Sequence, residues 1–318
     1  MTNQVFSKAE MAVLGLDIGG TKTAAGIVEF PSGEVSERIV IPTRPNRPGD
    51  QVLEEICQLA RSFKDAAEAS GRTLAGIGAG IAELVSPSGE VTSSQTIQWD
   101  GAPVRDMLAT IAPTVIESDV RAAAVGEALL GAGKDFRCFV YVTVGTGISS
   151  CLVQDSKPHV GAHGNALVMA TAPLSFFCSE CGAYSSTVLE EFSSGPALSR
   201  RYSKQSGQVV GGGEEVTSRA EEGDQCAISV VESAGRALGS GVGFLANVLD
   251  PEAIVVGGGL GLDGRLYWRA MVESTRQHIW ARAGKNVPIL KAKLGKDVGL
   301  VGAAVAFWNS NNGNLRRE

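Results

Sequence analysis

Two apolar, strand-like runs joined by a glycine turn open the chain and constrain its fold more than any other feature. The runs cover residues 12–18 and 24–29, and Gly19, Gly20 and Thr21 lie between them. Glycine lets backbone N–H groups approach an anion without a Cβ in the way, and threonine adds a hydroxyl donor. The turn therefore predicts a phosphate-binding hairpin, although an ordinary Gly-Gly turn explains the same residues equally well.

Asp17 lies at the end of the first run, just before this turn. A carboxylate does not bind phosphate itself, but Mg²⁺ prefers one or two carboxylates together with phosphate oxygens and water. We therefore expect Asp17 to hold a hydrated Mg²⁺ beside the turn.

The second half of the chain repeats the pattern. Residues 138–144 and 148–153 have the composition of strands, and Gly145, Thr146 and Gly147 form the turn between them. A lone Gly-Thr-Gly is a weak signal, but its recurrence at the same position between two strands favours a phosphate role for both turns. Two such hairpins predict a two-lobed α/β protein that binds a nucleotide in a central cleft.

The rest of the chain alternates between strand-like and helix-like periodicity. We expect an N-terminal lobe over residues 1–125 and a C-terminal nucleotide-binding lobe over 126–296, with a last helix at 297–310 packing back on the first lobe. The further strands are expected at 35–41, 74–82, 115–118, 253–259 and 288–293, and the helices at 49–70, 103–111, 120–131, 187–203, 217–221, 224–249, 264–282 and 297–308.

Composition excludes several classes of protein. The chain has 318 residues, of which 44% are hydrophobic, and this is ample for two cores. A net charge of −6 argues against a nucleic-acid-binding surface. No apolar run reaches the ~18 residues that span a bilayer, and the polar start lacks the pattern of a signal peptide. We therefore expect a cytoplasmic protein with a small-molecule partner, bound neither to membranes nor to nucleic acid.

Of six cysteines, only Cys178 and Cys181 are spaced as a pair. Their spacing is that of half a zinc knuckle, but a closed structural zinc site needs four ligands. His159 and His163 precede the pair and could contribute, although a loop that carries only free thiols is an equally good interpretation.

Asp119 lies at a strand end, immediately before a helical run. A carboxylate there points out of the sheet toward a cleft, where it could act as a general base. The alternative is a helix N-cap, a very common role for aspartate, and position alone favours it.

The triplet Gly257-Gly258-Gly259 follows a short apolar strand and precedes a helix. Backbone without side chains can pass close to a flat adenine or ribose, whereas the simpler interpretation is a flexible loop. Three consecutive glycines are hard to explain by turn geometry alone, so we favour a nucleotide contact.

Taken together, these segments resemble the ROK family of sugar kinases, which belongs to the larger group built like actin, hexokinase and the Hsp70 ATPase. The similarity covers nearly the whole chain, and the order and spacing of the pieces are specific although each piece is weak alone. The matching segments are Asp17-Ile18-Gly19-Gly20-Thr21-Lys22, Trp99-Asp100-Gly101-Ala102-Pro103-Val104, Glu117-Ser118-Asp119-Val120-Arg121, Gly145-Thr146-Gly147-Ile148, Gly161-Ala162-His163-Gly164, Ser194-Gly195-Pro196-Ala197, Asp250-Pro251-Glu252 and Gly257-Gly258-Gly259.

The resemblance implies an actin-like ATPase (ribonuclease H-like) fold and an ATP- and Mg²⁺-dependent kinase that phosphorylates a sugar hydroxyl. It makes Asp119 the catalytic base, in place of the cap, and implies a homodimer. The phosphate hairpin begins about a dozen residues into the chain, which leaves no room for the helix-turn-helix domain of ROK repressors. The implied ATP-binding residues are Asp17, Gly19, Gly20, Thr21, Lys22, Gly145, Thr146, Gly147 and Gly257 to Gly259, and the implied substrate-binding residues are Glu83, Gln95, Ser118, Asp119, Gly145, His163 and Glu190.

The chain departs from the family pattern where the acceptor should bind. Residues 167–171 replace a Gly-Glu-x-Gly-His stretch, so a carboxylate and a zinc-binding histidine are missing, and Val188 lies near the place of a third zinc cysteine. We therefore expect structural zinc to be absent or poorly bound. Gln95 and Glu83 replace an asparagine and a glycine of the family, and Glu83 adds a hydrogen-bond acceptor for the substrate.

A pocket that cannot pair a substrate's hydroxyls discriminates strongly against that substrate. These departures favour a carbasugar such as a C7-cyclitol over the family's usual sugars. The alternatives are a glucose or N-acetylhexosamine kinase, or a non-catalytic ligand-binding regulator.

Overall fold

A computed structural model describes residues 11–177 and 179–311. The chain divides into two compact units. Unit 1 comprises residues 11–134, 155–166 and 296–311 of the described chain, and unit 2 comprises residues 135–154 and 167–295. Residue 125, the lobe boundary proposed from the sequence, lies inside a continuous helix of unit 1, α3 (Asp119–Leu130).

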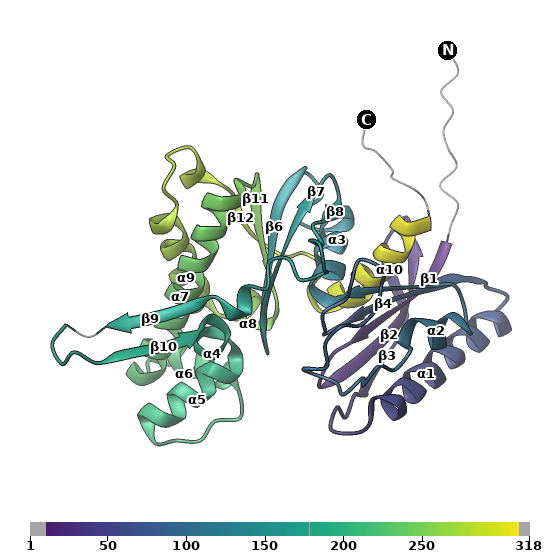
Figure 1. Cartoon of the computed structure of the whole chain (residues 1–318), viewed down its shortest axis with the longest axis horizontal. Helices are drawn as coiled ribbons and strands as arrows, with labels where there is room; N and C mark the ends of the chain where they lie inside the picture. The colour runs from purple at the N-terminus through teal and green to yellow at the C-terminus, as the bar shows by residue number, and fades with distance from the viewer. Residues whose placement is uncertain (1–10, 178, 312–318) are drawn as a thin grey trace, which may run out of the picture. The chain divides into compact units, whose positions relative to one another are not determined.

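Unit 1 is built on a five-stranded sheet (Figure 1), whose strand order is β3-β2-β1-β4-β5. The first three strands are antiparallel neighbours, whereas β1, β4 and β5 run parallel. Parallel strands bring their carboxyl ends to one edge of the sheet, and this edge carries the candidate site. The strands are β1 (Met11–Ile18), β2 (Lys22–Phe30), β3 (Glu34–Pro42), β4 (Leu74–Ile81) and β5 (Thr114–Ser118).

The two faces of this sheet have different side chains because residues alternate along a strand. On one face, isoleucines and leucines such as Leu14 and Ile77 form a core with α1 (Gly49–Ala69) and α2 (Val104–Ala109). On the other face, α10 (Val298–Asn311) lies so close that a Cβ at Gly15 or Gly78 would overlap its backbone. Glycine on this face is therefore required for α10 to pack directly on β1 and β4.

Unit 2 contains four strands of a second sheet, in the order β12-β11-β6-β7. Its core is formed by the valines of β6 and β11 together with the long helix α7 and helix α9. The strands are β6 (Cys138–Val144), β7 (Ile148–Gln154), β11 (Ala253–Gly257) and β12 (Ile289–Lys291), and the helices are α4 (Leu189–Ser193), α5 (Gly195–Ser206), α6 (Gly213–Glu221), α7 (Gln225–Leu249), α8 (Gly259–Asp263) and α9 (Arg265–His278). Short elements complete the chain: β8 (Lys157–Pro158) and the 3₁₀ turns Met169–Thr171, Gly284–Asn286 and Gly295–Asp297.

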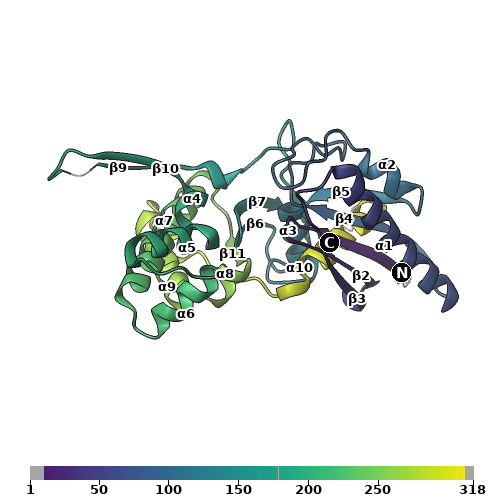
Figure 2. The same ribbon diagram turned by 90° about the horizontal axis from the view of Figure 1, so that it is seen from below.

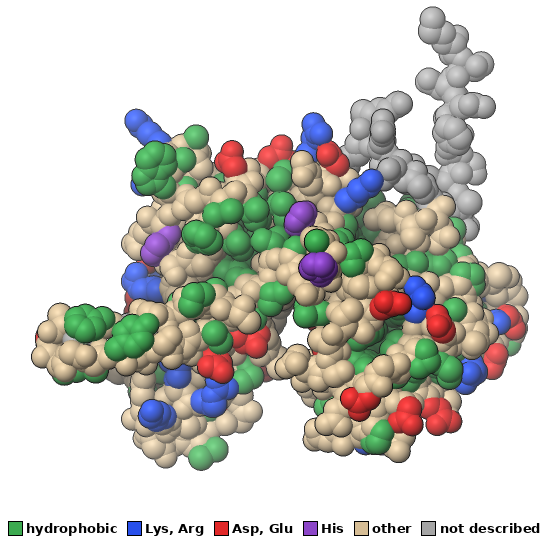
Figure 3. All heavy atoms as spheres, in the orientation of Figure 1, with side chains coloured by type: hydrophobic (Ala, Val, Ile, Leu, Met, Phe, Trp, Pro, Cys, Tyr) green, Lys and Arg blue, Asp and Glu red, His purple; other side chains and the backbone are tan. Residues whose placement is uncertain are grey.

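An antiparallel pair of strands, β9 (Pro173–Phe177) and β10 (Tyr184–Val188), projects from the rest of unit 2 (Figure 2). Hydrophobic side chains are exposed on this arm (Figure 3), where Phe177 and Tyr184 are 71% and 68% exposed. These strands were not predicted from the sequence, because their polar and aromatic residues do not alternate.

The helix predicted at 187–203 was wrong. Residues 187 and 188 belong to β10, and the remainder divides into α4 and α5 at Ser194. Ser194 has an extended backbone, and its hydroxyl accepts a hydrogen bond from Ala197 N at 3.4 Å. Ser194 followed by Gly195-Pro196 is a helix start, with proline in the first turn, and it interrupts the apolar period.

Most other predicted elements are confirmed within a few residues, including the two glycine-turn hairpins. The helix predicted at 264–282 ends earlier, at His278, because Ile279 has an extended backbone. Within the described residues, no helix has the length and apolarity needed to span a membrane.

Candidate active site

Thr43 anchors the turn between β1 and β2 by hydrogen bonds. The Thr43 hydroxyl donates to the carbonyl of Gly19 at 2.6 Å, and its N–H donates to the carbonyl of Thr21 at 3.0 Å. Thr43 also shares a hydrogen bond with Thr23 at 2.9 Å, and both side chains are buried. In the described part of the chain, the N–H groups of Gly20 and Thr21 make no hydrogen bond. The turn thus has the carbonyls of Gly19 and Thr21 bound and the N–H groups of Gly20 and Thr21 available for an anion.

Asp17 lies at the end of β1, on the sheet face that α10 covers. A Cβ at Gly299, in the first turn of α10, would overlap the Asp17 carboxylate. Burial raises the pKa of Asp17, while the positive charges of Lys22 and Arg38 oppose this effect. The positive end of a helix dipole also favours an anion at this place. Asp17 is therefore a half-buried carboxylate, and the positive charges and the helix N-terminus around it favour its ionised form.

Asp119 is the first residue of α3, directly after β5. Its Oδ1 accepts a hydrogen bond from Val120 N at 2.6 Å. Burial and the negative charge of Asp17 raise the pKa of Asp119 to about 7, with a smaller contribution from Glu83, while the Val120 N–H and the Arg121 charge oppose the rise. A carboxylate with a pKa near neutrality suits a general base.

The two aspartates lie at the same edge of the sheet because β1 and β5 both run parallel to β4, which lies between them. Gly80 of β4 pairs with Asp17 on one side and with Glu117 on the other. A Cβ at Gly80 would lie 3.7 Å from the Cα of Asp119. Glycine at position 80 thus leaves β4 without a side chain beside the start of α3.

Glu83 follows β4 and is only 7% exposed. Its carboxylate accepts hydrogen bonds from the backbone N–H groups of Gln95, Thr96 and Ile97 and from the Ser93 hydroxyl. The sequence predicted that this carboxylate would accept a substrate hydroxyl. In the structure it is already occupied by these four donors. The side chain of Gln95 is exposed, so it remains available to a substrate.

Arg121 fixes the loop that carries His163. Its guanidinium donates to the carbonyls of Gly164 and Val85, each at 2.7 Å, and forms an ion pair with Glu117 at 2.5 Å. The His163 side chain is exposed. This anchoring role of Arg121 was missed from the sequence, because arginine in a helix is usually a surface residue.

Ser118 lies at the end of β5, next to Asp119. Its buried Oγ has no hydrogen-bond partner among the residues that the structure describes. An unpaired buried hydroxyl at this position is consistent with the substrate contact expected from the sequence.

In unit 2, the turn between β6 and β7 is held by Glu190. Ile148 N donates to Glu190 Oε2 at 2.7 Å, and Gly145 N donates to the carbonyl of Gly147 at 2.9 Å. Within residues 11–177 and 179–311, the other oxygen of Glu190 has no hydrogen-bond partner. One oxygen of Glu190 thus shapes the turn, and the other can accept a hydroxyl.

Four backbone segments meet at this turn without side chains between them. Gly195 N donates to the carbonyl of Gly145 at 2.8 Å, and a Cβ at Gly213 would lie 2.6 Å from the Cα of Gly195. Gly258 has a φ of +83°, and a Cβ there would overlap the backbone of Val144. The predicted Gly257 loop therefore lies beside the Gly145 turn. Gly213 is a further glycine of this cluster and was not predicted from the sequence.

The structure describes one of the two cysteines that were predicted to bind zinc. Cys178 lies outside the described residues, and Cys181 is exposed. No group of three or more His, Cys, Asp or Glu side chains in the described chain is arranged to hold a metal ion. In the altered segment 167–171, Val168 is 39% exposed whereas Met169 is buried.

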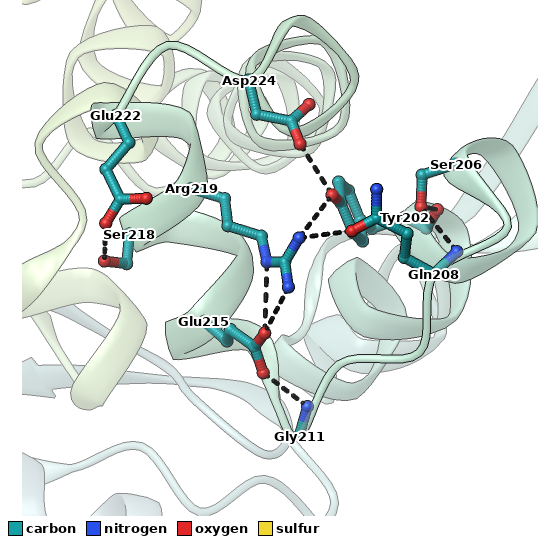
Figure 4. A network of polar contacts seen from close by, with 9 residues as sticks. All are labelled: Tyr202, Ser206, Gln208, Gly211, Glu215, Ser218, Arg219, Glu222 and Asp224. Atoms are coloured by element: carbon teal, nitrogen blue, oxygen red, sulfur yellow. Dashed lines mark hydrogen bonds and ion pairs between the residues drawn. The ribbon is translucent and has the colours of Figure 1, made fainter.

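A surface pocket over α6 has none of these residues in its lining, and the residues that line it belong to a network of polar contacts (Figure 4). The charge of Arg219 is already balanced there, because its guanidinium binds Glu215 at 2.8 Å. Arg219 also donates to Tyr202 and Gln208, at 3.1 and 2.6 Å, and Asp224 accepts from Tyr202 at 2.6 Å. These contacts join α5, α6 and the start of α7, so the network has a structural role. The pocket is lined by Glu215, Ser218, Arg219, Glu222 and Asp224.

Comparison with known proteins agrees with the resemblance inferred from the motifs. The profile of the ROK family matches residues 13–309. The glucokinase of Streptomyces coelicolor is 30% identical over 314 residues, covering 92% of this chain and 96% of the relative. The ROK hexokinase structure from Thermus thermophilus is 30% identical, with a TM-score of 0.78, and the match covers 95% of this chain and all of that one.

A ROK family glucokinase from Streptomyces griseus, solved in complex with glucose and AMPPNP, is 29% identical with a TM-score of 0.78. The match covers 92% of this chain and 98% of that chain. These similarities confirm the predicted actin-like ATPase fold.

Proposed function

The chain belongs to the ROK family, and we propose that it is a kinase that transfers the γ-phosphoryl group of ATP to a hydroxyl of a sugar or sugar-like acceptor. The relatives named above are two glucokinases and a hexokinase, and the similarity extends over nearly their whole length. The observation that carries the proposal is the pair of carboxylates, Asp17 and Asp119, beside a turn whose N–H groups are available.

In the proposed reaction, an acceptor hydroxyl oxygen attacks the γ-phosphorus of ATP. A bond forms between this oxygen and phosphorus, the bond from phosphorus to the bridging β-phosphate oxygen breaks, and ADP leaves with the electron pair. Asp119 accepts the hydroxyl proton, for which its pKa of about 7 is suited. The backbone N–H groups of Gly20 and Thr21 and the Thr21 hydroxyl stabilise charge on the phosphoryl oxygens.

The residues present also fit a magnesium ion. Burial raises the pKa of Asp17, and a divalent cation would favour the ionised carboxylate that burial disfavours. When bound, Mg²⁺ would neutralise charge on the transferring phosphates. We assign Lys22 and the turn at Gly145, Thr146 and Gly147 to the ATP phosphates, and Gly257 to Gly259 to the nucleoside.

For the acceptor, we propose a carbasugar such as a C7-cyclitol, with glucose and N-acetylhexosamines as alternatives. The support is the segment at 167–171, where Val168 offers no hydrogen bond. A substrate hydroxyl buried against such a side chain would lose its pairing with water without gaining a partner. The groups expected to contact the acceptor are Gln95, Ser118, Asp119, Gly145, His163 and the open oxygen of Glu190.

The test of the phosphotransfer role is Asp119→Asn. This variant should bind ATP with an affinity close to that of the wild type, as measured by calorimetry, and lose turnover by about 10²- to 10⁴-fold, the usual contribution of a general base. Wild-type turnover in the variant would disprove the base assignment.

A panel of acceptors separates the alternatives. ADP release is measured with hexoses, N-acetylhexosamines and cyclitols, and the ratio of kcat/KM values ranks the acceptors. If no acceptor supports turnover while a ligand raises the melting temperature, the chain is a non-catalytic binding protein.

A further inference from the structure

The Glu83 carboxylate is surrounded by donors from one short loop. Its Oε1 accepts from the N–H groups of Thr96 at 2.6 Å and Ile97 at 3.0 Å. Its Oε2 accepts from Gln95 N at 3.0 Å and from the Ser93 hydroxyl. A carboxylate has about four lone-pair sites, so these bonds use its whole accepting capacity.

The same loop depends on Glu83 for its backbone pairing. Three successive N–H groups converge on one side chain, an arrangement typical of an anion-binding nest. Ile97 is buried, with an exposed fraction of 1%, so water cannot replace the carboxylate there. Ser93 Oγ also accepts from Leu84 N at 2.9 Å, which ties the loop to the residue after Glu83.

The loop also touches the phosphate-binding turn. The methyl group of Thr96 lies against Gly20 so closely that a Cβ at residue 20 would overlap it. Ala82 N donates to the carbonyl of Ile18 at 3.0 Å, so the segment that carries Glu83 is fixed to the strand before the turn. Glu83, the loop and the turn thus form one connected unit.

We propose that Glu83 is a positioning residue that sets acceptor specificity. Its carboxylate holds loop 93–97 against Gly20, and this fixes where the exposed side chains of Gln95 and Thr96 meet the acceptor. This inference rests on the proposed kinase function. The ligand class is a polyhydroxylated ring, whose hydroxyls are read by the loop side chains while the Glu83 carboxylate itself stays in the backbone nest.

The experiment compares Glu83→Gln with Glu90→Gln, in which the same substitution is made at an exposed glutamate of the neighbouring hairpin. Glutamine keeps the size of Glu83 but turns an NH₂ group toward N–H donors. KM is measured for ATP and for three acceptors: D-glucose, N-acetyl-D-glucosamine and the C7-cyclitol valiolone. We expect the KM of the preferred acceptor to rise about tenfold or more in Glu83→Gln, with the KM of ATP within about twofold, and both unchanged in Glu90→Gln.

Hydrogen exchange of the amides of residues 95–97 gives a readout that needs no turnover. Exchange should be faster in Glu83→Gln than in the wild type and in Glu90→Gln. If Glu83→Gln does not fold, Ser93→Ala removes one of the four donors and should raise the acceptor KM in the same direction by a smaller factor.

An unchanged acceptor KM together with unchanged exchange would overturn the inference while the kinase function stands. An equal rise in the KM of ATP and in the KM of the acceptor would also overturn the inference, because that result indicates a general loosening of the active site. Absence of wild-type turnover with any acceptor would instead refute the proposed function, and with it the specificity role of Glu83.

Discussion

The carboxylate of Asp17 lies against Gly299, with no space between them for even one side-chain carbon. Asp17 ends the first strand of unit 1, and Gly299 belongs to the first turn of its last helix. The helix N-terminus therefore meets the carboxylate that is proposed to hold magnesium, and its dipole favours the charged form. A contact between the two ends of the chain thus helps to build the site.

The first prediction concerns this contact. Gly299→Ala places a methyl group where the Asp17 carboxylate lies, so the carboxylate must move. We expect the apparent affinity for Mg²⁺ in the kinase assay to fall about tenfold and stability to fall by about 1–3 kcal/mol. Gly212→Ala is the matched control, because a Cβ there meets open space. Equal magnesium dependence in both variants would contradict the role given to the contact.

The second prediction concerns the pH dependence of turnover. Asp119 has a pKa of about 7 and must be deprotonated to accept a proton. We therefore expect kcat/KM to be low at acidic pH and to rise as pH increases through about 7. A profile that is flat between about pH 5.5 and 8.5 would show that another group is the base.

The third prediction is that Asp119→Asn stabilises the protein. The pKa of Asp119 is raised from 3.8 to about 7 in the folded state. The folded state therefore holds a proton that the unfolded state has lost, and stability falls as pH rises between these values and stays low above them. At about 1.4 kcal/mol for each pKa unit, the upper bound of this cost is about 4 kcal/mol.

Chemical denaturation at pH 8 and pH 5 checks this expectation. Asparagine should raise the free energy of unfolding by about 1–4 kcal/mol at pH 8 and by less at pH 5. Asp65→Asn, at an exposed position of α1, serves as the control and should change little. A destabilised Asp119→Asn variant at pH 8 would mean that the charged carboxylate is favourable in its place.

Local patterns were sufficient to predict much of the fold. The alternation of glycine with isoleucine in β4 indicated a buried strand, and the repeated strand, turn and strand pattern identified both hairpins. The site motifs were found for the same reason, because Asp17 and Gly19 to Thr21 are adjacent in sequence. Such features depend on residues that are neighbours in sequence, and they can therefore be recognised from the sequence alone.

The remaining features depend on residues that are distant in sequence. Thr43 and Gly213 contact distant backbone, and Gly299 contacts the Asp17 carboxylate. No local sequence pattern indicates these contacts. Glu83 was predicted to bind substrate because a new carboxylate in a site suggests a new acceptor. Its partners are backbone N–H groups of a loop, and the sequence does not reveal the direction in which these N–H groups point.

The fourth prediction tests the support of the phosphate turn. Thr43→Val keeps the shape of the side chain but removes the hydroxyl that binds the Gly19 carbonyl and Thr23. We expect a loss of about 1–3 kcal/mol of stability, since buried partners are left unpaired, and a rise of several-fold in the KM of ATP. Thr110→Val is the control at an exposed position. If the two variants have the same KM for ATP, the turn does not depend on Thr43.

The fifth prediction concerns Arg121, whose side chain is 6% exposed. Arg121→Met keeps the length of the side chain but removes the charge that pairs with Glu117 and the donors that bind Val85 and Gly164. Breaking a buried ion pair leaves an uncompensated charge, so we expect a loss of about 3 kcal/mol, measured by urea denaturation.

The effect of Arg121→Met on function separates anchoring from simple stability. The guanidinium binds the carbonyl of Gly164, directly after His163, and that of Val85 in another loop. Hydrogen exchange should therefore accelerate at residues 161–166 before global unfolding. Arg105→Met removes an exposed arginine that also binds a carbonyl, that of Ser88, and should leave this exchange unchanged. If Arg121→Met lowers stability without changing exchange at residues 161–166, the arginine stabilises the core alone. Faster exchange together with a raised acceptor KM would instead show that the buried charge of Arg121 keeps the loop at residues 161–166, which carries His163, in place.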